Sequence, residues 1–134
     1  MTCHVLVADD EPHIGRIVKT KLETGPFQVT LVFDGTEALD ALALHDDIRL
    51  VLLDLMMPHL SGLDVLARMR HDPRWSSIPC VILTAAGQDQ HYDEAMRLGA
   101  SDFITKPFSP KRLYARVVAL TGMDDSADAP PDLR

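Results

Sequence analysis

The sequence predicts an α/β fold in which a doubly wound, five-stranded parallel sheet is covered by five helices. Apolar runs of strand length alternate with helical patterns five times along the 134 residues. The central run, Leu50–Leu53, is apolar at every position, which is typical of a parallel strand buried on both faces. This alternation implies right-handed crossovers and places ligands at the carboxyl edge of the sheet.

A change of periodicity marks the first two strand and helix units. The apolar run at 5–8 is followed by four apolar residues at helical spacing: Ile14, Ile17, Val18 and Leu22. Gly25 and Pro26 end that helix. Every second residue from Phe27 to Phe33 is apolar, as in a half-buried strand. Asp34 with Glu37 three residues later resembles a capping box, so we expect the second helix to begin there.

The other three units follow in the same order. A second capping-box pattern at Ser61–Asp64 predicts the start of the third helix. The fourth strand is predicted at 80–83 and the fifth around 103–104. We expect the fourth and fifth helices to end near Gly99 and Gly122.

Composition and charge disfavour several classes of function. The net charge of −7 provides no basic surface for direct binding of nucleic acid or an anionic membrane. The chain shows no signal peptide and no apolar run of membrane-spanning length, so we expect a cytoplasmic protein. Cys3 and Cys80 open apolar runs, and we interpret both as reduced core residues.

The domain organisation is predicted to be simple. Residues 1–122 contain all the strand and helix signals, so we expect them to form one domain. Residues 123–134 are acidic, contain prolines and have almost nothing to bury, which predicts a disordered tail or linker. We expect no effector domain after it.

Polar residues follow four of the five predicted strands: Asp9 and Asp10, Asp54, Thr84 and Lys106. Taken singly, the residues other than Asp54 have an ordinary explanation, as a helix cap, a strand residue or a surface charge. Asp54 differs, because it directly follows four apolar residues and has no helix to cap. Taken together, they converge on one edge of a parallel sheet. Three clustered carboxylates repel one another unless they are protonated or bridged by a cation. The pattern therefore predicts a divalent-ion site with the oxygen ligands that suit Mg²⁺.

Four motifs contain these residues. They are Val7-Ala8-Asp9-Asp10-Glu11, Leu53-Asp54-Leu55-Met56-Met57-Pro58, Leu83-Thr84-Ala85 and Thr105-Lys106-Pro107-Phe108. With Gly62 and the segment 99–103, they make the sequence resemble the receiver domains of response regulators in two-component signalling, including the chemotaxis regulators. The resemblance covers about residues 4–122. It implies a flavodoxin-like fold with strand order 2-1-3-4-5, and a signalling switch rather than an enzyme.

The resemblance also implies which residues hold a metal ion. Mg²⁺, with Mn²⁺ as an alternative, would bind Asp10, Asp54 and the backbone carbonyl of Met56, while Asp9 would act through a bound water. Asp54 would be the phospho-acceptor and would receive its group from a sensor histidine kinase or a phosphotransfer protein.

Other residues are implied to respond to the phosphoryl group. Thr84, with Ala85 beside it, would contact the group, Lys106 would pair with its charge, and the peptide bond before Pro107 would be cis. Phe103 would move inward and change the surface formed by the fourth helix, the fifth strand and the fifth helix. That surface would bind a downstream protein, a separate effector or a second copy of the chain. The alternative is that Phe103 is a static core aromatic.

Two positions bear on the lifetime of the phosphorylated form and on competing functions. Met56 and Ala86, two residues after Asp54 and Thr84, have no polar group to orient water, which predicts slow autodephosphorylation. A Mg²⁺-dependent phosphatase with an aspartyl nucleophile would need a second acid where Met56 stands. A flavodoxin-like cofactor binder would have to place a phosphate against the acids at 9–11. A phosphorylation-independent adaptor would not need the acid, threonine and lysine set.

Overall fold

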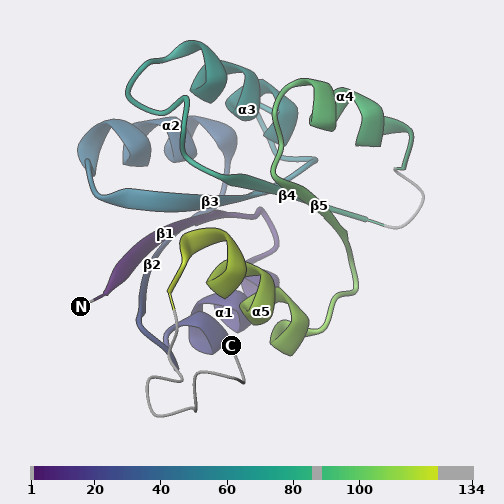
Figure 1. Cartoon of the computed structure of the whole chain (residues 1–134). Coiled ribbons are helices and arrows are strands. Elements are labelled where there is room, and N and C mark those ends of the chain that lie inside the picture. The colour runs from purple at the N-terminus through teal and green to yellow at the C-terminus, as the bar shows by residue number, and fades with distance from the viewer. Residues whose placement is uncertain (1, 86–88, 124–134) are drawn as a thin grey trace.

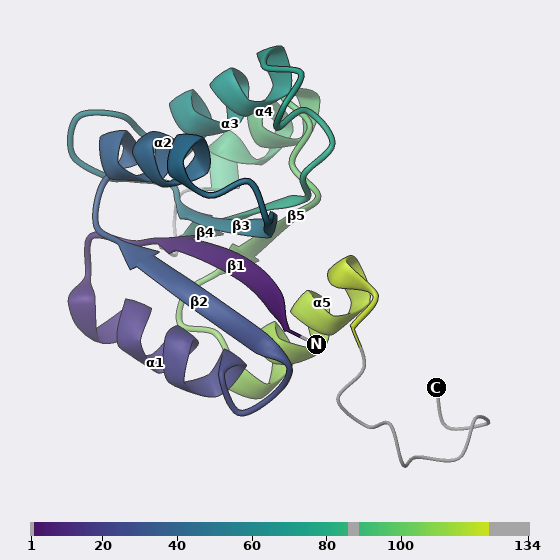
Figure 2. The same cartoon turned by 90° about the vertical axis from the view of Figure 1, so that its left-hand side faces the viewer.

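The computed structural model describes residues 2–85 and 89–123, which form a five-stranded parallel sheet between two layers of helices (Figures 1 and 2). The strands are β1 (Cys3–Ala8), β2 (Phe27–Val32), β3 (Ile48–Asp54), β4 (Cys80–Thr84) and β5 (Asp102–Thr105). The helices are α1 (Pro12–Leu22), α2 (Gly35–Leu44), α3 (Gly62–His71), α4 (Tyr92–Arg97), preceded by the 3₁₀ turn η1 (Asp89–His91), and α5 (Pro110–Thr121). The strand order is β2-β1-β3-β4-β5, so the predicted fold class is confirmed.

The sheet separates two apolar clusters. Helices α2, α3 and α4 cover one face, and α1 and α5 cover the other (Figure 1). Alternate residues of β1 belong to different clusters: Leu6 and Ala8 pack with α2, α3 and α4, while Val5 and Val7 pack with α1 and α5. β1 and β4 are buried at every position, which explains the consecutive apolar residues at 5–8 and 80–83.

Two helix starts form around the capping patterns of the sequence. At α3, the backbone N–H of Asp64 donates to the Ser61 hydroxyl, and the backbone N–H of Ser61 donates to the Asp64 carboxylate. At α2, the backbone N–H of Glu37 donates to the Asp34 carboxylate. The Glu37 carboxylate accepts from the N–H of Phe33 rather than from Asp34, so this cap reaches one residue further back.

Two apolar residues predicted to be buried are exposed. Ile17 is 47% exposed because α1 buries a narrower stripe, which includes Val18 and Leu22. Phe33 is 42% exposed because the edge strand β2 ends at Val32 and leaves Phe33 in the following turn.

Three other predictions concern the cysteines, the membrane and the chain end. Cys3 and Cys80 are free and buried, as predicted. Within the described ranges, no helix combines the length and the apolar character needed to cross a membrane. Ala86 and residues 124–134, which include all but the first residue of the predicted tail, lie outside the described residues.

Candidate functional site

Four carboxylates gather at the carboxyl edge of the sheet, and we call them the acidic cluster: Asp9, Asp10, Glu11 and Asp54. Asp9 follows β1, Asp54 ends β3, and the other two lie in the loop before α1. One carboxylate oxygen of each residue lies within 4.8 Å of those of the others. Asp9 and Asp54 are buried, whereas Asp10 and Glu11 are exposed, so the cluster is open to solvent on one side.

Asp9 is held by the loop in which it lies. Its backbone N–H donates to the carbonyl of Val32, and its Oδ1 accepts from the backbone N–H of Glu11 at 2.9 Å. Glu11 is the N-cap residue of α1, and its own side chain makes no capping hydrogen bond. Asp9 therefore shapes the loop rather than capping the helix, and its second oxygen, Oδ2, is left for the site.

Lys106 follows β5 and extends into the acidic cluster. Its Nζ lies 2.9 Å from both Asp9 Oδ2 and Glu11 Oε1, and 3.5 Å from Asp54 Oδ2. Burial by itself would lower the pKa of Lys106, but its close pairing with the carboxylates of Asp9 and Glu11 raises the pKa above its ordinary value. The hydrogen bond from Lys106 lowers the pKa of Glu11. The ammonium group is therefore charged at neutral pH.

Asp54 has an environment that disfavours its charged form. Burial, followed by the negative charge of Asp9, raises the pKa of Asp54 from its ordinary value of 3.8 to about 7. The charge of Lys106 opposes this rise, while a hydrogen bond with Asp10 adds to it. One lysine thus faces four carboxylates, and the site carries excess negative charge that a divalent cation would neutralise.

The second oxygen of Asp9 gives an independent indication of a cation site. This Oδ2 is buried and forms an ion pair with Lys106 Nζ at 2.9 Å. Within the described residues, no donor makes a well-directed hydrogen bond to it. Buried polar atoms are normally satisfied, so an incomplete partner set needs an explanation. Hard oxygen donors with one side open to water fit Mg²⁺, which keeps several of its waters. The acidic cluster could therefore hold this ion.

Hydrogen bonds tie together the ends of β3, β4 and β5. The backbone N–H of Leu55 donates to the carbonyl of Leu83 at 2.7 Å, and that of Lys106 donates to the carbonyl of Thr84 at 2.6 Å. Thr84 is fully buried and its hydroxyl donates to the carbonyl of Ala85, which is itself exposed. The register of the sheet therefore brings Thr84 to the same edge as Asp54 and Lys106.

Comparison with known proteins agrees with this geometry. The family model of the response regulator receiver domain matches residues 5–118. The chain belongs to this family. The receiver domain is thus a component of two-component signalling. The carboxyl edge of its sheet holds the five residues that the sequence singled out: Asp9, Asp10, Asp54, Thr84 and Lys106.

Individual relatives of the receiver domain are transcriptional regulators and other receivers. YkoG of Bacillus subtilis (strain 168), an uncharacterized transcriptional regulatory protein, is 41% identical over 116 residues, 87% of this chain and 50% of that protein. RpaA of Synechocystis, a DNA-binding dual master transcriptional regulator, is 39% identical over 121 residues, 90% of this chain and 50% of that protein. The solved receiver domain of the Francisella response regulator 1452 is 35% identical, with a TM-score of 0.82, and the match covers 90% and 98% of the two chains. The receiver domain spans about half the length of the curated relatives it matches.

Phe103 lies on β5, away from the acidic cluster. Its side chain is partly buried against the apolar cluster beneath α2, α3 and α4, and its ring meets the ring of Tyr92 edge to face, with 5.4 Å between centroids. A groove of about 570 Å³ runs along β5 and α5, with Phe103, Phe108 and Arg112 among its lining residues. The Lys106–Pro107 peptide bond, at the start of the same segment, is cis, as the resemblance implied.

Two residues of the site had no assigned role from the sequence alone. Glu11 forms an ion pair with Lys106, and its position directly after Asp10 was the available signal. Gly62 allows the loop after Asp54 to turn back on itself, because a Cβ there would lie 2.5 Å from the Asp54 carbonyl oxygen. The Met56 side chain is 56% exposed and, being a thioether, supplies no second acid beside Asp54.

Proposed function

We propose that this receiver domain accepts a phosphoryl group on Asp54 and so acts as a switch in a phosphorelay. The observation that carries the proposal is the position of the Asp54 carboxylate. It ends the central strand, is 8% exposed in its side chain and lies 3.5 Å from the ammonium of Lys106. The donor would be a phosphohistidine of a sensor histidine kinase or of a phosphotransfer protein, because that is the chemistry of the family.

We assign Asp10, Asp54 and the backbone carbonyl of Met56 as ligands of Mg²⁺, with Asp9 acting through a bound water. The excess of carboxylates and the incompletely satisfied Oδ2 of Asp9 support this assignment. Bound Mg²⁺, or Mn²⁺ in its place, would supply positive charge where negative charge develops on the phosphoryl oxygens. A metal ion of this kind also favours the ionised form of Asp54.

The reaction needs an ionised and correctly placed Asp54. A carboxylate oxygen attacks the phosphorus opposite the donor imidazole, the P–O bond forms, and the P–N bond breaks with its electron pair leaving on nitrogen. Lys106, which pairs with Asp9 and Glu11, is close enough to turn toward the new negative charge. The protein contributes position and charge, and the product is an acyl phosphate on Asp54.

The proposed response to phosphorylation begins at Thr84. Its hydroxyl, with Ala85 beside it, would contact the phosphoryl group, and the movement would make space for Phe103 to turn inward. Because Phe103 also packs on Tyr92 of α4, its movement would change the α4, β5 and α5 surface. Since the curated relatives are longer transcriptional regulators, we propose that this surface controls an effector, a partner protein or a second copy. Residues 1–122 would form the switch without direct contact to nucleic acid.

Phosphorylation by acetyl phosphate tests the proposal. With Mg²⁺, the wild-type protein should gain one phosphoryl group that peptide mass spectrometry maps to Asp54. It should gain none in EDTA, and Asp54→Asn should gain none, whereas Asp40→Asn, an exposed site on α2, should match the wild type. No modification of the wild type would favour an adaptor, and turnover of a phosphate ester would favour a phosphatase. Either result would refute the proposal.

Two further measurements test the finer assignments. Because Met56 carries no polar group to orient water, the phosphorylated form should decay slowly, and Met56→Glu should accelerate its decay. Equal rates of dephosphorylation in the wild type and in Met56→Glu would contradict that reasoning. Phe103→Ala should still be phosphorylated but should lose the change at α4, β5 and α5 that amide NMR detects in the wild type. An unchanged response would make Phe103 a static core residue.

A further inference from the structure

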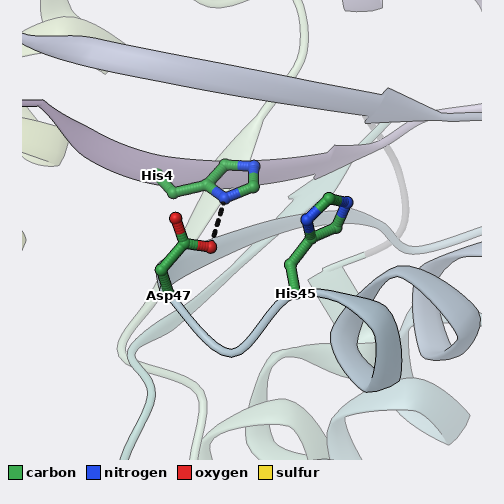
Figure 3. Close-up of side chains that lie close together, drawn as sticks. All are labelled: His4, His45 and Asp47. Carbon is green, nitrogen blue, oxygen red and sulfur yellow. Dashed lines mark hydrogen bonds and ion pairs between the residues drawn. The ribbon is translucent and has the colours of Figure 1, made fainter.

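A second group of candidate metal ligands lies at the opposite end of the sheet, and we call it the histidine cluster: His4, His45 and Asp47 (Figure 3). His4 is the second residue of β1, His45 follows α2, and Asp47 lies in the loop before β3. One ligand atom of each residue lies within 4.8 Å of those of the other two. His4 precedes Asp9 by five residues of extended chain, roughly 16 Å, so the two clusters cannot share an ion.

The His4 ring is buried and held from both sides. The residue is 4% exposed; its Nδ1 lies 2.7 Å from Asp47 Oδ1 and its Nε2 lies 2.6 Å from Thr30 Oγ1. The His45 ring stands edge-on to it, with 5.0 Å between centroids. Figure 3 shows one nitrogen of His45 facing the hydrogen bond between His4 and Asp47. Two imidazoles and a carboxylate thus converge on one point.

The local fold brings these side chains together from three segments. His4 alternates in β1 with Val5 and so shares the face of Leu6 and Ala8, which α2 covers. The β1 and β3 register shifts at this place: His4 pairs with Ile48 but Val5 pairs with Leu50. Such irregularities bend a strand and redirect its side chains, and they are frequent beside functional sites. Here the shift lies immediately after Asp47.

From this arrangement we infer that the histidine cluster binds Zn²⁺ or a related divalent transition-metal ion. Imidazole nitrogens and a carboxylate oxygen are the ligands that such ions prefer, and three protein ligands leave a fourth position for water. Thr30 would be the outer partner of His4, because a metal-binding imidazole usually donates its other ring N–H to an oxygen. Within the described residues, the His45 ring makes no hydrogen bond of its own, so its lone pair is available.

The cluster can receive the ion if the proton of His4 changes nitrogen and the Asp47 carboxylate moves aside. A neutral His4 that donates from Nδ1 to Asp47 would shift its proton to Nε2, which then donates to Thr30, and Nδ1 would bind the metal. Tetrahedral ligands at about 2.0–2.1 Å stand roughly 3.3 Å apart, so Nδ1 and Oδ1 must separate by about 0.6 Å, and Oδ1 must also move out of the lone-pair direction of Nδ1, which the metal would occupy. The Asp47 side chain is 64% exposed and lies in a loop, so it can make this movement.

The presence of His45 distinguishes a metal site from a purely structural hydrogen bond between His4 and Asp47. A hydrogen bond between His4 and Asp47 that only fastens the loop to β1 has no need of a second imidazole. A metal site needs it as the third ligand. Removing His45 should therefore weaken metal binding while leaving the hydrogen bonds of His4 in place.

Zinc titration by calorimetry is the test, with the full chain in excess Mg²⁺ so that the acidic cluster does not compete. We expect one Zn²⁺ to bind, with changes in the ¹⁵N signals of the His4 and His45 rings. Both His45→Ala and Asp47→Asn should weaken binding about tenfold or more. His71→Ala, an exposed histidine at the end of α3, should bind as the wild type does.

The possible contrary results are equally specific. No binding of Zn²⁺, equal binding by His45→Ala, or loss of binding when Mg²⁺ is added would each overturn the inference. Circular dichroism and urea unfolding of both variants establish that a loss of binding does not arise from unfolding. His4→Ala is less suitable, because it removes a buried ring. The proposed phosphorylation of Asp54 is independent of all these outcomes.

Discussion

The raised pKa of Asp54 predicts that the metal-free protein becomes less stable as the pH rises. In the unfolded chain this carboxyl has its ordinary pKa of 3.8, whereas burial and the charge of Asp9 raise the pKa to about 7 in the folded protein. Between these values the folded state binds more protons than the unfolded state, so the free energy of unfolding decreases with increasing pH. The stability contributed by the protonated group is complete below pH 3.8 and is lost as the pH passes 7.

The size of the effect follows from the same two values. A difference between 3.8 and about 7 corresponds to ~4 kcal/mol of unfolding free energy at about 1.4 kcal/mol per pKa unit. Roughly 2 to 3 kcal/mol of this falls between pH 5 and pH 8, because part of the loss has already occurred by pH 5. Because the Asp54 side chain is only 8% exposed, solvent screening reduces this contribution to the unfolding free energy little.

Urea unfolding of the wild type and Asp54→Asn in EDTA measures this contribution. The substitution keeps the shape of the side chain and removes its charge, so other titrating groups largely cancel in the comparison. Between pH 5 and pH 8, the free energy of unfolding of the wild type should fall by ~2 to 3 kcal/mol relative to that of Asp54→Asn. Asp40→Asn should show the same pH dependence as the wild type. Mg²⁺ should reduce the difference at pH 8. A constant difference across the pH range, or one of opposite slope, would refute the reasoning.

Three other predictions concern the same edge of the sheet. Apparent Mg²⁺ affinity, measured by calorimetry, should rise by up to ~10-fold per pH unit below pH 7 and level off above pH 7. The reason is that a proton on Asp54 competes with the ion. An affinity that does not change with pH would contradict this prediction. Gly62→Ala should destabilise the protein by ~1 to 3 kcal/mol in urea, since its Cβ would lie 2.5 Å from the Asp54 carbonyl oxygen, and an unchanged midpoint would mean that the loop adapts. Ser61→Ala should lower the free energy of unfolding by ~1 kcal/mol through loss of the α3 cap, with Ser77→Ala, an exposed serine between α3 and β4, as a control; equal effects of the two would argue against the capping role.

The sequence predicted the parts of the fold that depend on burial and local chemistry. The inner strands are apolar at consecutive positions because both faces are covered, and Ser61 and Asp64 carry the chemistry of a helix start in their side chains. The errors lie at the periphery. Ile17 and Phe33 fit an apolar period, but a period does not show how wide the buried stripe of a helix is or where an edge strand ends.

The edge position of the site was predictable, but its ion pairs were not. Parallel strands must place Asp9, Asp54 and Lys106 at one edge once the topology is known. Which carboxylate the lysine contacts depends on side-chain geometry: Lys106 lies closer to Asp9 and Glu11 than to Asp54. The histidine cluster was not found because His4 and Asp47 are 43 residues apart, and nothing local in the sequence relates them.

The contacts of Lys106 indicate how the unphosphorylated and phosphorylated forms of the site would differ. In the structure the lysine shares its charge between Asp9 and Glu11, and this partial compensation makes a buried pair of aspartates tolerable. A divalent ion at the acidic cluster would take over that role, since it brings twice the charge to the same oxygens. Lys106 would then be free to pair with the phosphoryl group on Asp54 without leaving Asp9 uncompensated. Glu11, whose side chain is 50% exposed, thus holds the lysine near the reaction through an ion pair that solvent screens on one side.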